Sequence, residues 1–388
     1  MDGLKKQRNQ HGGDIYTGNP ENTGNDGDLN SAIIDLSSNI NPGELPGAVY
    51  EQLPAILERA RHYPDLEYRA LRQTLANYLN RLCGPIRETE IFTAGMITPG
   101  NGASEVTDHL ISLFARVLIP VPSFTEYEAS ALRHGLAMEF IPVYADLKPD
   151  GSTMAAARGK AFFDTIAGKM NRDTLLILTN PNNPDGQVLD KRAFCAYLQT
   201  AQAAGWHTLV DETFGEYLPR EEMILDLLPQ FPNLIVVKAL TKFFCLPGLR
   251  LGYAVSAKET LQRQLEARQT PWSVGTFDEA IATIMLGDEA FLIKSQADNR
   301  ANRAYLQEKL EERGLFAQVF PSRANFVMAE LSPRFISAAG LTDFLRQAGI
   351  LIRPLSDMLG LRGEFVRIAV KEKSKTDRLI LRLGQLKK

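Results

Sequence analysis

The chain has 388 residues, of which 44% are hydrophobic and 23% are charged, and its net charge is −3. This length predicts roughly two to three domains, and the mixed, slightly acidic charge argues against a nucleic-acid or membrane surface. The three cysteines are far apart, and no Cys or His pair has metal-ligand spacing. The sequence therefore predicts neither a disulfide framework nor a metal site.

The N-terminal segment is polar and lacks the apolar core of a secretory signal. Since no apolar run is long enough to span a bilayer, we expect a soluble, cytoplasmic protein. Residues 17–30 are rich in Gly, Asn and Asp, which indicates an exposed loop. Residues 45–60 and 66–82 are predicted to be helical, and Leu71, Leu75 and Tyr78 give the second helix its periodic apolar face.

From residue 96 to residue 255, short apolar runs alternate with helical segments. The predicted strands are MITP, RVLIPV, MEFIPV, TLLILT, HTLVD, LIVVKA and LGYAV. This alternation predicts a mainly parallel sheet covered on both faces, and such sheets bind ligands beyond the carboxyl ends of their strands. After a helical stretch at 256–315, the runs FAQVF, NFVMAEL, GILIRPL and EFVRIAV with two more helices predict a smaller α+β unit.

Two of the strand ends carry loops suited to ligand binding. In TPGNGASE, residues 98–105, the glycines allow close backbone approach and the following helix N-terminus favours an anion. The segment lacks the third glycine of a dinucleotide motif and the lysine of a Walker loop. A tight turn that binds no ligand is therefore an alternative interpretation. In LTNPNNPDG, residues 178–186, two Asn-Pro steps restrict the backbone and fix the asparagine side chains. A stiff loop without function is the alternative.

Two further strand ends carry charged residues. Asp211 ends the strand in HTLVDETF, where a buried carboxylate needs a cation or several donors. A helix cap or a salt bridge would also satisfy it. Lys242 and Arg250 lie in the apolar stretch ALTKFFCLPGLRLGYAV. Burial favours a neutral lysine amine, which can attack a carbonyl, whereas arginine offers a planar fork for phosphate. A snorkelling surface lysine is the commoner alternative. Together, the four segments suit an aldehyde cofactor with a phosphate, a hydroxyl and a basic ring nitrogen.

This set of motifs resembles fold-type I pyridoxal-phosphate (PLP) enzymes of the aminotransferase superfamily. HGGDIY, DLSSNINPG, HYPDLEY, TPWSV and SRANF resemble most the threonine-phosphate decarboxylases of cobalamin biosynthesis, whose near relatives are histidinol-phosphate aminotransferases. The resemblance implies the α/β fold of aspartate aminotransferase, with a mainly parallel seven-stranded sheet in a large domain and a smaller α+β domain. The implied division is 1–48 as an N-terminal part of the small domain, 49–275 as the large PLP-binding domain and 276–388 as the small C-terminal domain.

The resemblance also implies residue roles. Lys242 would form a Schiff base with PLP and move protons, and Asp211 would pair with the pyridinium nitrogen. Asn183 would contact the ring 3′-oxygen and the substrate, and Phe124 would stack on the ring. The implied phosphate-binding residues of the cofactor site are Gly102, Ala103, Ser104, Thr241, Arg250 and, across a homodimer with shared active sites, Tyr63. The implied substrate residues are Arg367 for the carboxylate, Arg353 for the phosphate, and His11 and Asn41 at the same end.

Four positions depart from the wider superfamily. Phe214 stands where many aminotransferases have a tyrosine, and Ala239 where a hydroxyl residue often contacts the cofactor phosphate. Asp185 replaces the usual threonine of the Asn-Pro motif, and Lys371 replaces a glycine or arginine. The sequence predicts little effect from the change at Asp185 and indicates no clear consequence of the change at Lys371.

The resulting prediction is a lyase that decarboxylates the small phosphorylated amino acid L-threonine O-3-phosphate to (R)-1-amino-2-propanol O-phosphate and CO2. Decarboxylation of L-serine O-phosphate is an alternative, because one methyl group is worth only about 1–3 kcal/mol of discrimination. A histidinol-phosphate aminotransferase would use nearly the same residues. A non-catalytic PLP-binding regulatory module is disfavoured, because the chain is slightly acidic and only a short polar segment precedes the fold.

Overall fold

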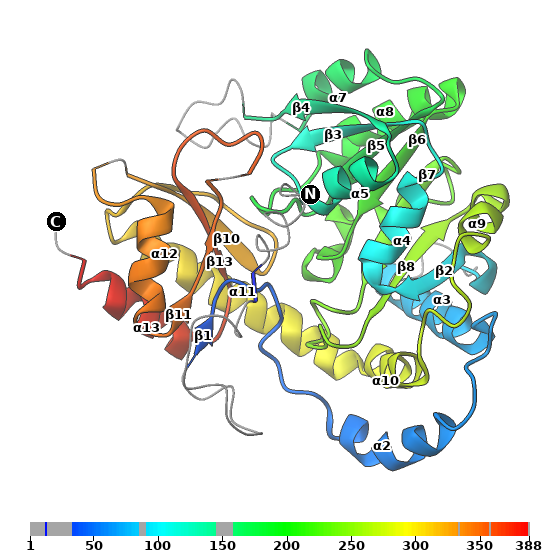
Figure 1. Cartoon of the computed structure of the whole chain (residues 1–388), viewed down its shortest axis with the longest axis horizontal. Helices are drawn as coiled ribbons and strands as arrows, with labels where there is room; N and C mark the ends of the chain where they lie inside the picture. Colours follow the sequence, from blue (N-terminus) through cyan, green and yellow to red (C-terminus); the bar gives the residue numbers. More distant parts are fainter. Residues whose placement is uncertain are drawn as a thin grey trace.

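The computed structural model describes residues 12–13, 33–84, 91–144, 158–332, 334–356 and 358–386. In these ranges the chain forms a larger and a smaller unit, joined by the long helix α11 (Glu289–Glu311) (Figure 1). His11 and the predicted loop at 17–30 lie outside the described residues. Among the described residues, none of the helices combines the length and the apolar composition needed to cross a membrane.

The larger unit contains a seven-stranded sheet in the order β2-β8-β7-β6-β5-β3-β4. Its strands are β2 (Ile97–Asn101), β3 (Arg116–Val121), β4 (Ala137–Pro142), β5 (Thr174–Thr179), β6 (His207–Asp211), β7 (Leu234–Ala239) and β8 (Leu251–Ser256). All run parallel except β8, which is antiparallel to both neighbours. The predicted mainly parallel sheet is confirmed. Because β8 is reversed, Arg250 at its start lies at the edge where the other strands end.

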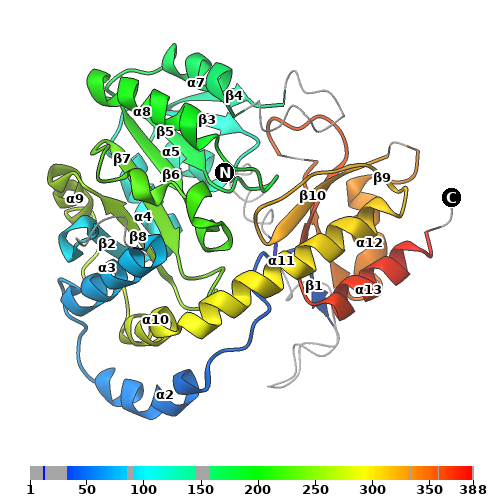
Figure 2. The ribbon, with the colours of Figure 1, turned by 180° about the vertical axis from the view of Figure 1, so that it is seen from behind.

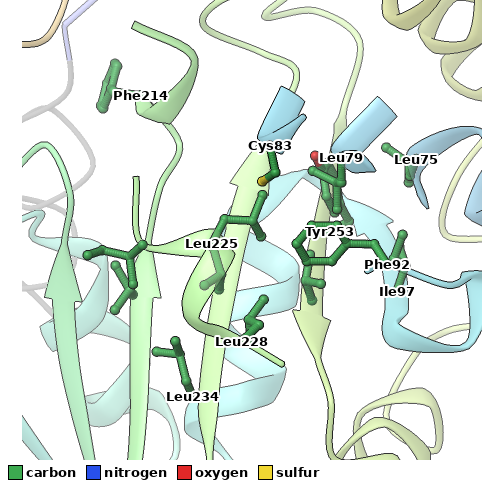
Figure 3. Packing of buried hydrophobic residues seen from close by; sticks show 14 of the residues in the cluster. Leu75, Leu79, Cys83, Phe92, Ile97, Phe214, Leu225, Leu228, Leu234 and Tyr253 are labelled. Carbon is green, nitrogen blue, oxygen red and sulfur yellow. The ribbon is translucent and has the colours of Figure 1, made fainter. Parts of the chain in front are cut away.

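Helices cover both faces of this sheet. One face packs against α3 (Arg69–Cys83), α7 (Lys160–Ala167), α8 (Lys191–Ala204) and α10 (Thr276–Gly287). The other packs against α4 (Gly102–Ile111), α5 (Glu126–Arg133) and α9 (Glu259–Glu266). Figure 3 shows Leu79 of α3 next to Tyr253 of β8, with Cys83 and Leu75 of the same helix on either side of Leu79. Burial on both faces explains why these strands appear in the sequence as nearly continuous apolar runs.

The smaller unit is built on a four-stranded antiparallel sheet in the order β12-β13-β10-β9. Its strands are β9 (Phe316–Val319), β10 (Phe326–Leu331), β12 (Arg353–Pro354) and β13 (Phe365–Ala369). Beside it, β1 (Ile34–Asp35) pairs in parallel with β11 (Ile350–Leu351), which brings the N-terminal segment into this unit. Helices α12 (Ala338–Arg346) and α13 (Lys373–Leu383) complete it.

Packing separates the two units between α10 and α11. Ile281 and Met285 of α10 belong to the core of the large unit, whereas Leu306 and Leu310 of α11 belong to that of the small unit. In Figure 2, α11 runs from beside α10 to the small sheet. We therefore propose a division between these two helices, later than the boundary at residue 276 predicted from the sequence. The remaining elements are α2 (Gly47–Arg59), which packs on α10, and the short 3-10 helices η2 (Ala94–Met96), η3 (Gly215–Tyr217), η4 (Arg220–Glu222) and η5 (Leu225–Leu227).

Candidate active site

A cavity of about 430 Å³ is lined by residues from both units, at the carboxyl edge of the large sheet. Its volume lies within the range of about 300–1,000 Å³ that is usual for small-molecule sites. Ten of the residues predicted from the sequence line it: Ala103, Ser104, Phe124, Asn183, Asp211, Thr241, Lys242, Arg250, Arg353 and Arg367. The fold thus gathers residues more than 260 positions apart in the sequence around one space.

Lys242 is half-buried in the turn after β7. Burial is the main cause that lowers the pKa of the Lys242 amine from its ordinary 10.5 to about 8. The charges of Arg367 and Arg250 lower this pKa further, against the opposing effect of Asp211. About a tenth of the amine is therefore neutral at pH 7, and a neutral amine can attack an aldehyde.

Asp211, the last residue of β6, has a buried carboxylate held by three donors. Its Oδ2 accepts a hydrogen bond of 2.6 Å from the Tyr127 hydroxyl. Its Oδ1 accepts from the Thr213 backbone N–H at 2.8 Å and from the Thr213 hydroxyl. Burial and the nearby Asp211 charge raise the pKa of Tyr127, so that its hydroxyl keeps the proton that it donates. These contacts fix the direction of the carboxylate at the cavity wall.

The start of α4 packs closely against Arg250 and Gly252 and forms a candidate phosphate-binding site with them. Gly102 has a φ of +80°, and a Cβ there would lie 2.7 Å from Nη2 of Arg250. On the other side, a Cβ at Gly252 of β8 would lie 2.1 Å from the backbone nitrogen of Ala103. Glycine at both positions therefore lets β8 and the Arg250 guanidinium approach the first turn of the helix. Free N–H groups at a helix start together with a cation suit a phosphate.

Two arginines lie side by side on the small sheet and both line the cavity. Arg353 of β12 is the direct antiparallel partner of Arg367 in β13. Arg367 is only 8% exposed; its Nη1 donates to Oδ1 of Asn183, and its Nη2 donates to the Ser37 carbonyl at 3.1 Å. Burial first, and the Arg353 charge second, lower the pKa of Arg367 to about 9. Like charges placed this closely favour an anionic ligand between or beside them.

The structure corrects the prediction for Asn41, which does not line the cavity. Its Nδ2 donates to the Phe243 carbonyl at 2.8 Å and to Ser295 Oγ at 2.9 Å, and its backbone N–H donates to the Lys242 carbonyl at 2.9 Å. Asn41 therefore holds the turn that carries Lys242. Asn39 of the same NINP motif lines the cavity instead, and its buried Oδ1 has no partner within the described ranges.

Tyr63 also lies outside the cavity of its own chain. Its side chain is 81% exposed and stacks on Trp272, with the ring centroids 4.6 Å apart. This position is compatible with a contact to a second subunit, which stays a prediction. His11 cannot be placed, because it precedes the described pair Gly12 and Gly13. In the part of the chain that the structure describes, no group of three or more His, Cys, Asp or Glu residues could hold a metal ion.

Sequence reasoning missed Tyr127 and Asn39. Tyr127 follows Phe124 in VPSFTEY, but only the direction of α5 shows that it reaches β6. The two asparagines of NINP are separated by one residue, so that the sequence alone gave no reason to prefer Asn39 over Asn41.

Comparison with known proteins identifies the family. The model of the family "Aminotransferase class I and II" matches residues 31–383. The chain belongs to the aminotransferase class I and II family. A putative threonine-phosphate decarboxylase of Caldanaerobacter subterraneus is 32% identical to this aminotransferase-family chain. The match covers 96% of this chain and 92% of the relative.

Solved structures agree with this placement. The histidinol-phosphate aminotransferase from Clostridium acetobutylicum is 31% identical, with a TM-score of 0.79, over 90% of this chain and 97% of that one. The histidinol-phosphate aminotransferase from Sinorhizobium meliloti, in complex with pyridoxal-5′-phosphate, is 21% identical, with a TM-score of 0.74 over 90% and 89% of the two chains. The fold is therefore that of the fold-type I PLP-dependent aminotransferases.

The cofactor of this aminotransferase-family protein is pyridoxal 5′-phosphate. The cavity has the donor set that this group requires. It offers an amine of lowered pKa for the aldehyde, an oriented carboxylate for the ring nitrogen, an aromatic side chain for the ring face, and a glycine-bounded helix start with a cation for the phosphate.

The lowered pKa of Lys242 predicts how cofactor attachment depends on pH. Because only the neutral amine attacks, we expect the attachment rate to rise with pH through about 8 and to level off above it. Mixing PLP with the cofactor-free protein and following the visible absorbance over time measures this rate. In Arg367→Leu the midpoint should move to higher pH, since the Arg367 charge is the second cause of the shift. A midpoint near the ordinary 10.5 in the parent protein would contradict the assignment.

The close contact at Gly252 gives a second prediction. Gly252→Ala places a Cβ against the backbone of Ala103, so we expect the free energy of unfolding to fall by about 1–3 kcal/mol and PLP to bind more weakly. Chemical denaturation and a PLP titration measure the two effects. Gly287→Ala is the control, because a Cβ there meets nothing within 4 Å. Equal stability and equal PLP affinity of the two variants would show that the candidate phosphate-binding site at the start of α4 does not depend on this contact.

Proposed function

We propose that the protein decarboxylates L-threonine O-3-phosphate to (R)-1-amino-2-propanol O-phosphate and CO2, as a step of cobalamin biosynthesis. The observation that carries the proposal is the pair of Arg353 and Arg367, which are direct strand partners and both line the cavity. A phosphorylated amino acid supplies two anionic groups, a carboxylate and a phosphate, for these two cations. The relative named as a putative threonine-phosphate decarboxylase supports the same choice.

The cavity residues take the following roles in this proposal. When bound, PLP would supply an electron sink for the substrate bond that breaks at Cα. Lys242 would hold the cofactor and return a proton to the substrate Cα after CO2 has left. Asp211 would pair with the ring nitrogen, Phe124 would stack on the ring and Asn183 would contact the 3′-oxygen. The cofactor phosphate would be held at the start of α4 by Gly102, Ala103, Ser104, Thr241 and Arg250.

Orientation of the substrate decides which bond breaks. Arg367, held by Asn183, would bind the substrate carboxylate and orient it, so that the bond between Cα and this carboxylate breaks and CO2 is released. Arg353 binds the phosphate of the substrate. Misplacement by about 1 Å changes such rates by roughly 10²-fold, which is why decarboxylation and amino transfer can share the same residue types.

We also propose a homodimer with shared sites. Tyr63 would reach the cofactor phosphate of the second subunit, since its side chain is exposed and lies outside its own cavity. Trp272, on which Tyr63 stacks, is also exposed. The helix α2 and the start of α10, which pack together, and the segment after α2 carry further exposed large hydrophobic residues: Tyr50, Leu53, Leu57, Leu66 and Phe277. Exposed apolar side chains of this kind fit an interface with another copy of the chain.

Turnover of three phosphorylated substrates tests the proposal. The PLP-loaded protein is incubated with L-threonine O-3-phosphate, with L-serine O-phosphate, and with histidinol phosphate plus 2-oxoglutarate. We expect CO2 from threonine phosphate and no amino transfer. Amino transfer from histidinol phosphate without CO2 would reject the proposal in favour of the second candidate, a histidinol-phosphate aminotransferase, to which the similarity in structure points. Faster turnover of serine phosphate would reject only the substrate, and PLP binding without turnover would indicate a regulatory module.

A further inference from the structure

We propose that Asp185 is a positioning residue for the substrate-carboxylate site, and that it acts through the Asn182–Asn183 loop on Arg367. The inference rests on the proposed function in that Arg367 is taken to bind the carboxylate. Asp185 stands where the resemblance to the family motif implies a threonine, a change from which the sequence predicted little effect. The proposal departs from that expectation.

The Asp185 carboxylate is fully buried and is the centre of a hydrogen-bonded cluster. Its Oδ2 accepts from the Tyr144 hydroxyl, from Arg158 Nη2 at 2.8 Å and from Asn182 Nδ2 at 2.9 Å. Its Oδ1 accepts from the Gln187 backbone N–H at 2.8 Å. A buried carboxylate is tolerated only with such donors and a paired cation. A threonine could not neutralise Arg158, which is itself buried, so aspartate and arginine form one unit.

Asn182, in the loop that follows β5, links Asp185 to the end of β5 and to the segment that follows β3. Besides its bond to Asp185, its Nδ2 donates to the Pro122 carbonyl at 3.2 Å, and its Oδ1 accepts from the Thr179 hydroxyl. Its backbone carbonyl accepts from the Gly186 N–H at 2.7 Å. Pro122 lies two residues before Phe124, and Thr179 ends β5. Asp185 therefore locks together the ends of two strands that border the cavity.

Asn183 lies inside this locked loop and contacts the carboxylate-binding arginine. Its Oδ1 accepts from Nη1 of Arg367, so its direction sets how the guanidinium is presented. The far end of the loop docks on the small unit. The Gly186 carbonyl accepts from the Arg323 N–H at 2.8 Å, and a Cβ at Gly186 would lie 2.0 Å from Ser322 Oγ. Asp185 thus fixes Asn183 relative to both the large sheet and the sheet that carries Arg367.

The test compares a ligand that has the carboxylate with one that lacks it. In Asp185→Asn we expect kcat/KM for L-threonine O-3-phosphate to fall by roughly 10-fold or more. With both ligands measured on protein saturated with PLP, the inhibition constant of the decarboxylated product should change by less than about 2-fold, because the product has no carboxylate for Arg367 to bind. PLP occupancy is measured in parallel, since Asn183 also contacts the cofactor in the proposed function. Equal losses for the two ligands would overturn the proposal, since a purely structural role would affect both. Asp226→Asn, which removes the carboxylate of an ion pair with Lys191 that is outside the cavity lining, is the control.

Coupling to Arg367 provides a second readout. In an Arg367→Leu background, Asp185→Asn should cause no further loss for the carboxylate ligand, because the contact through which it acts is gone. Additive losses would overturn the proposal. If Asp185→Asn does not fold because Arg158 is left unpaired, the double variant Asp185→Asn/Arg158→Gln removes both charges and is measured in the same way. An unchanged ratio between the two ligands in that folded variant would also overturn it.

Failure of the proposed function is recognised separately. It appears as a lack of CO2 release by the parent protein, before any variant is made. In that case the same comparison is made with the α-amino acid that the parent protein does use and the amine that lacks its carboxylate. The positioning role of Asp185 is then judged on that pair.

Discussion

Lys242→Ala is expected to remove the visible absorbance of the attached cofactor and nearly all turnover. Among the described residues that line the cavity, Lys242 is the one lysine, and burial lowers the pKa of its amine. Loss of its proton transfers alone predicts a decrease in kcat of about 10²–10⁴-fold, and loss of the covalent attachment adds to this.

The measurement for Lys242→Ala is a spectrum and a kcat after loading with PLP. Lys160→Ala is a suitable control, because Lys160 is an exposed residue of α7 that lies outside the cavity lining and pairs with the neighbouring Asp164. Full activity of the Lys242 variant would disprove its role, whereas a normal spectrum would show that PLP is attached elsewhere.

Arg367→Leu is expected to have the second largest effect. The variant keeps an apolar stem near Phe326, whose ring the guanidinium covers at 5.4 Å, but loses the buried cation. Truncating one partner of a buried charged contact costs about 2–5 kcal/mol, which corresponds to roughly a 30- to 4,000-fold fall in kcat/KM. The inhibition constant of the decarboxylated product should change far less, because that ligand has no carboxylate.

Steady-state kinetics with L-threonine O-3-phosphate and inhibition by its product give the two numbers for Arg367→Leu. The PLP content of the variant is measured in parallel, since the Arg367 charge also influences Lys242. Equal losses for both ligands would show that Arg367 binds some other group of the substrate.

The strands and the edge that carries the site were predictable from the sequence. Strands such as β5 and β7 are buried along their whole length, so that they appear as apolar runs bounded by turn residues. Residues at the carboxyl ends of parallel strands meet at one edge, which is why the glycine loop, the Asn-Pro loop, Asp211 and Lys242 could be placed together.

Contacts between distant segments were not predictable. Asp185 meets Arg158 and Tyr144, which are 27 and 41 residues away, and no local pattern joins the three. Lys238 lies within the apolar strand LIVVKA, yet it is fully buried because Glu216 binds its ammonium at 3.1 Å. Such partners are brought together only when the chain folds. A prediction from the sequence therefore treats each of these residues without its partner.

Lys371 is a further example. The sequence suggested no consequence for a lysine after IAV, but the structure buries it, with Nζ donating to the Ile40 carbonyl. Burial lowers the pKa of this amine to about 8. Its charge also contributes to the lowered pKa of Lys242, after the charges of Arg367 and Arg250. The reactivity of the central amine thus depends on cations from both units.

The most direct test of the account is to find where the cofactor is attached. The PLP-loaded protein is reduced with borohydride, digested and analysed by mass spectrometry. The account predicts a pyridoxyl group on the peptide that contains Lys242 and none on other lysines. A modified lysine at another position, or a protein that takes up no PLP at all, would contradict it.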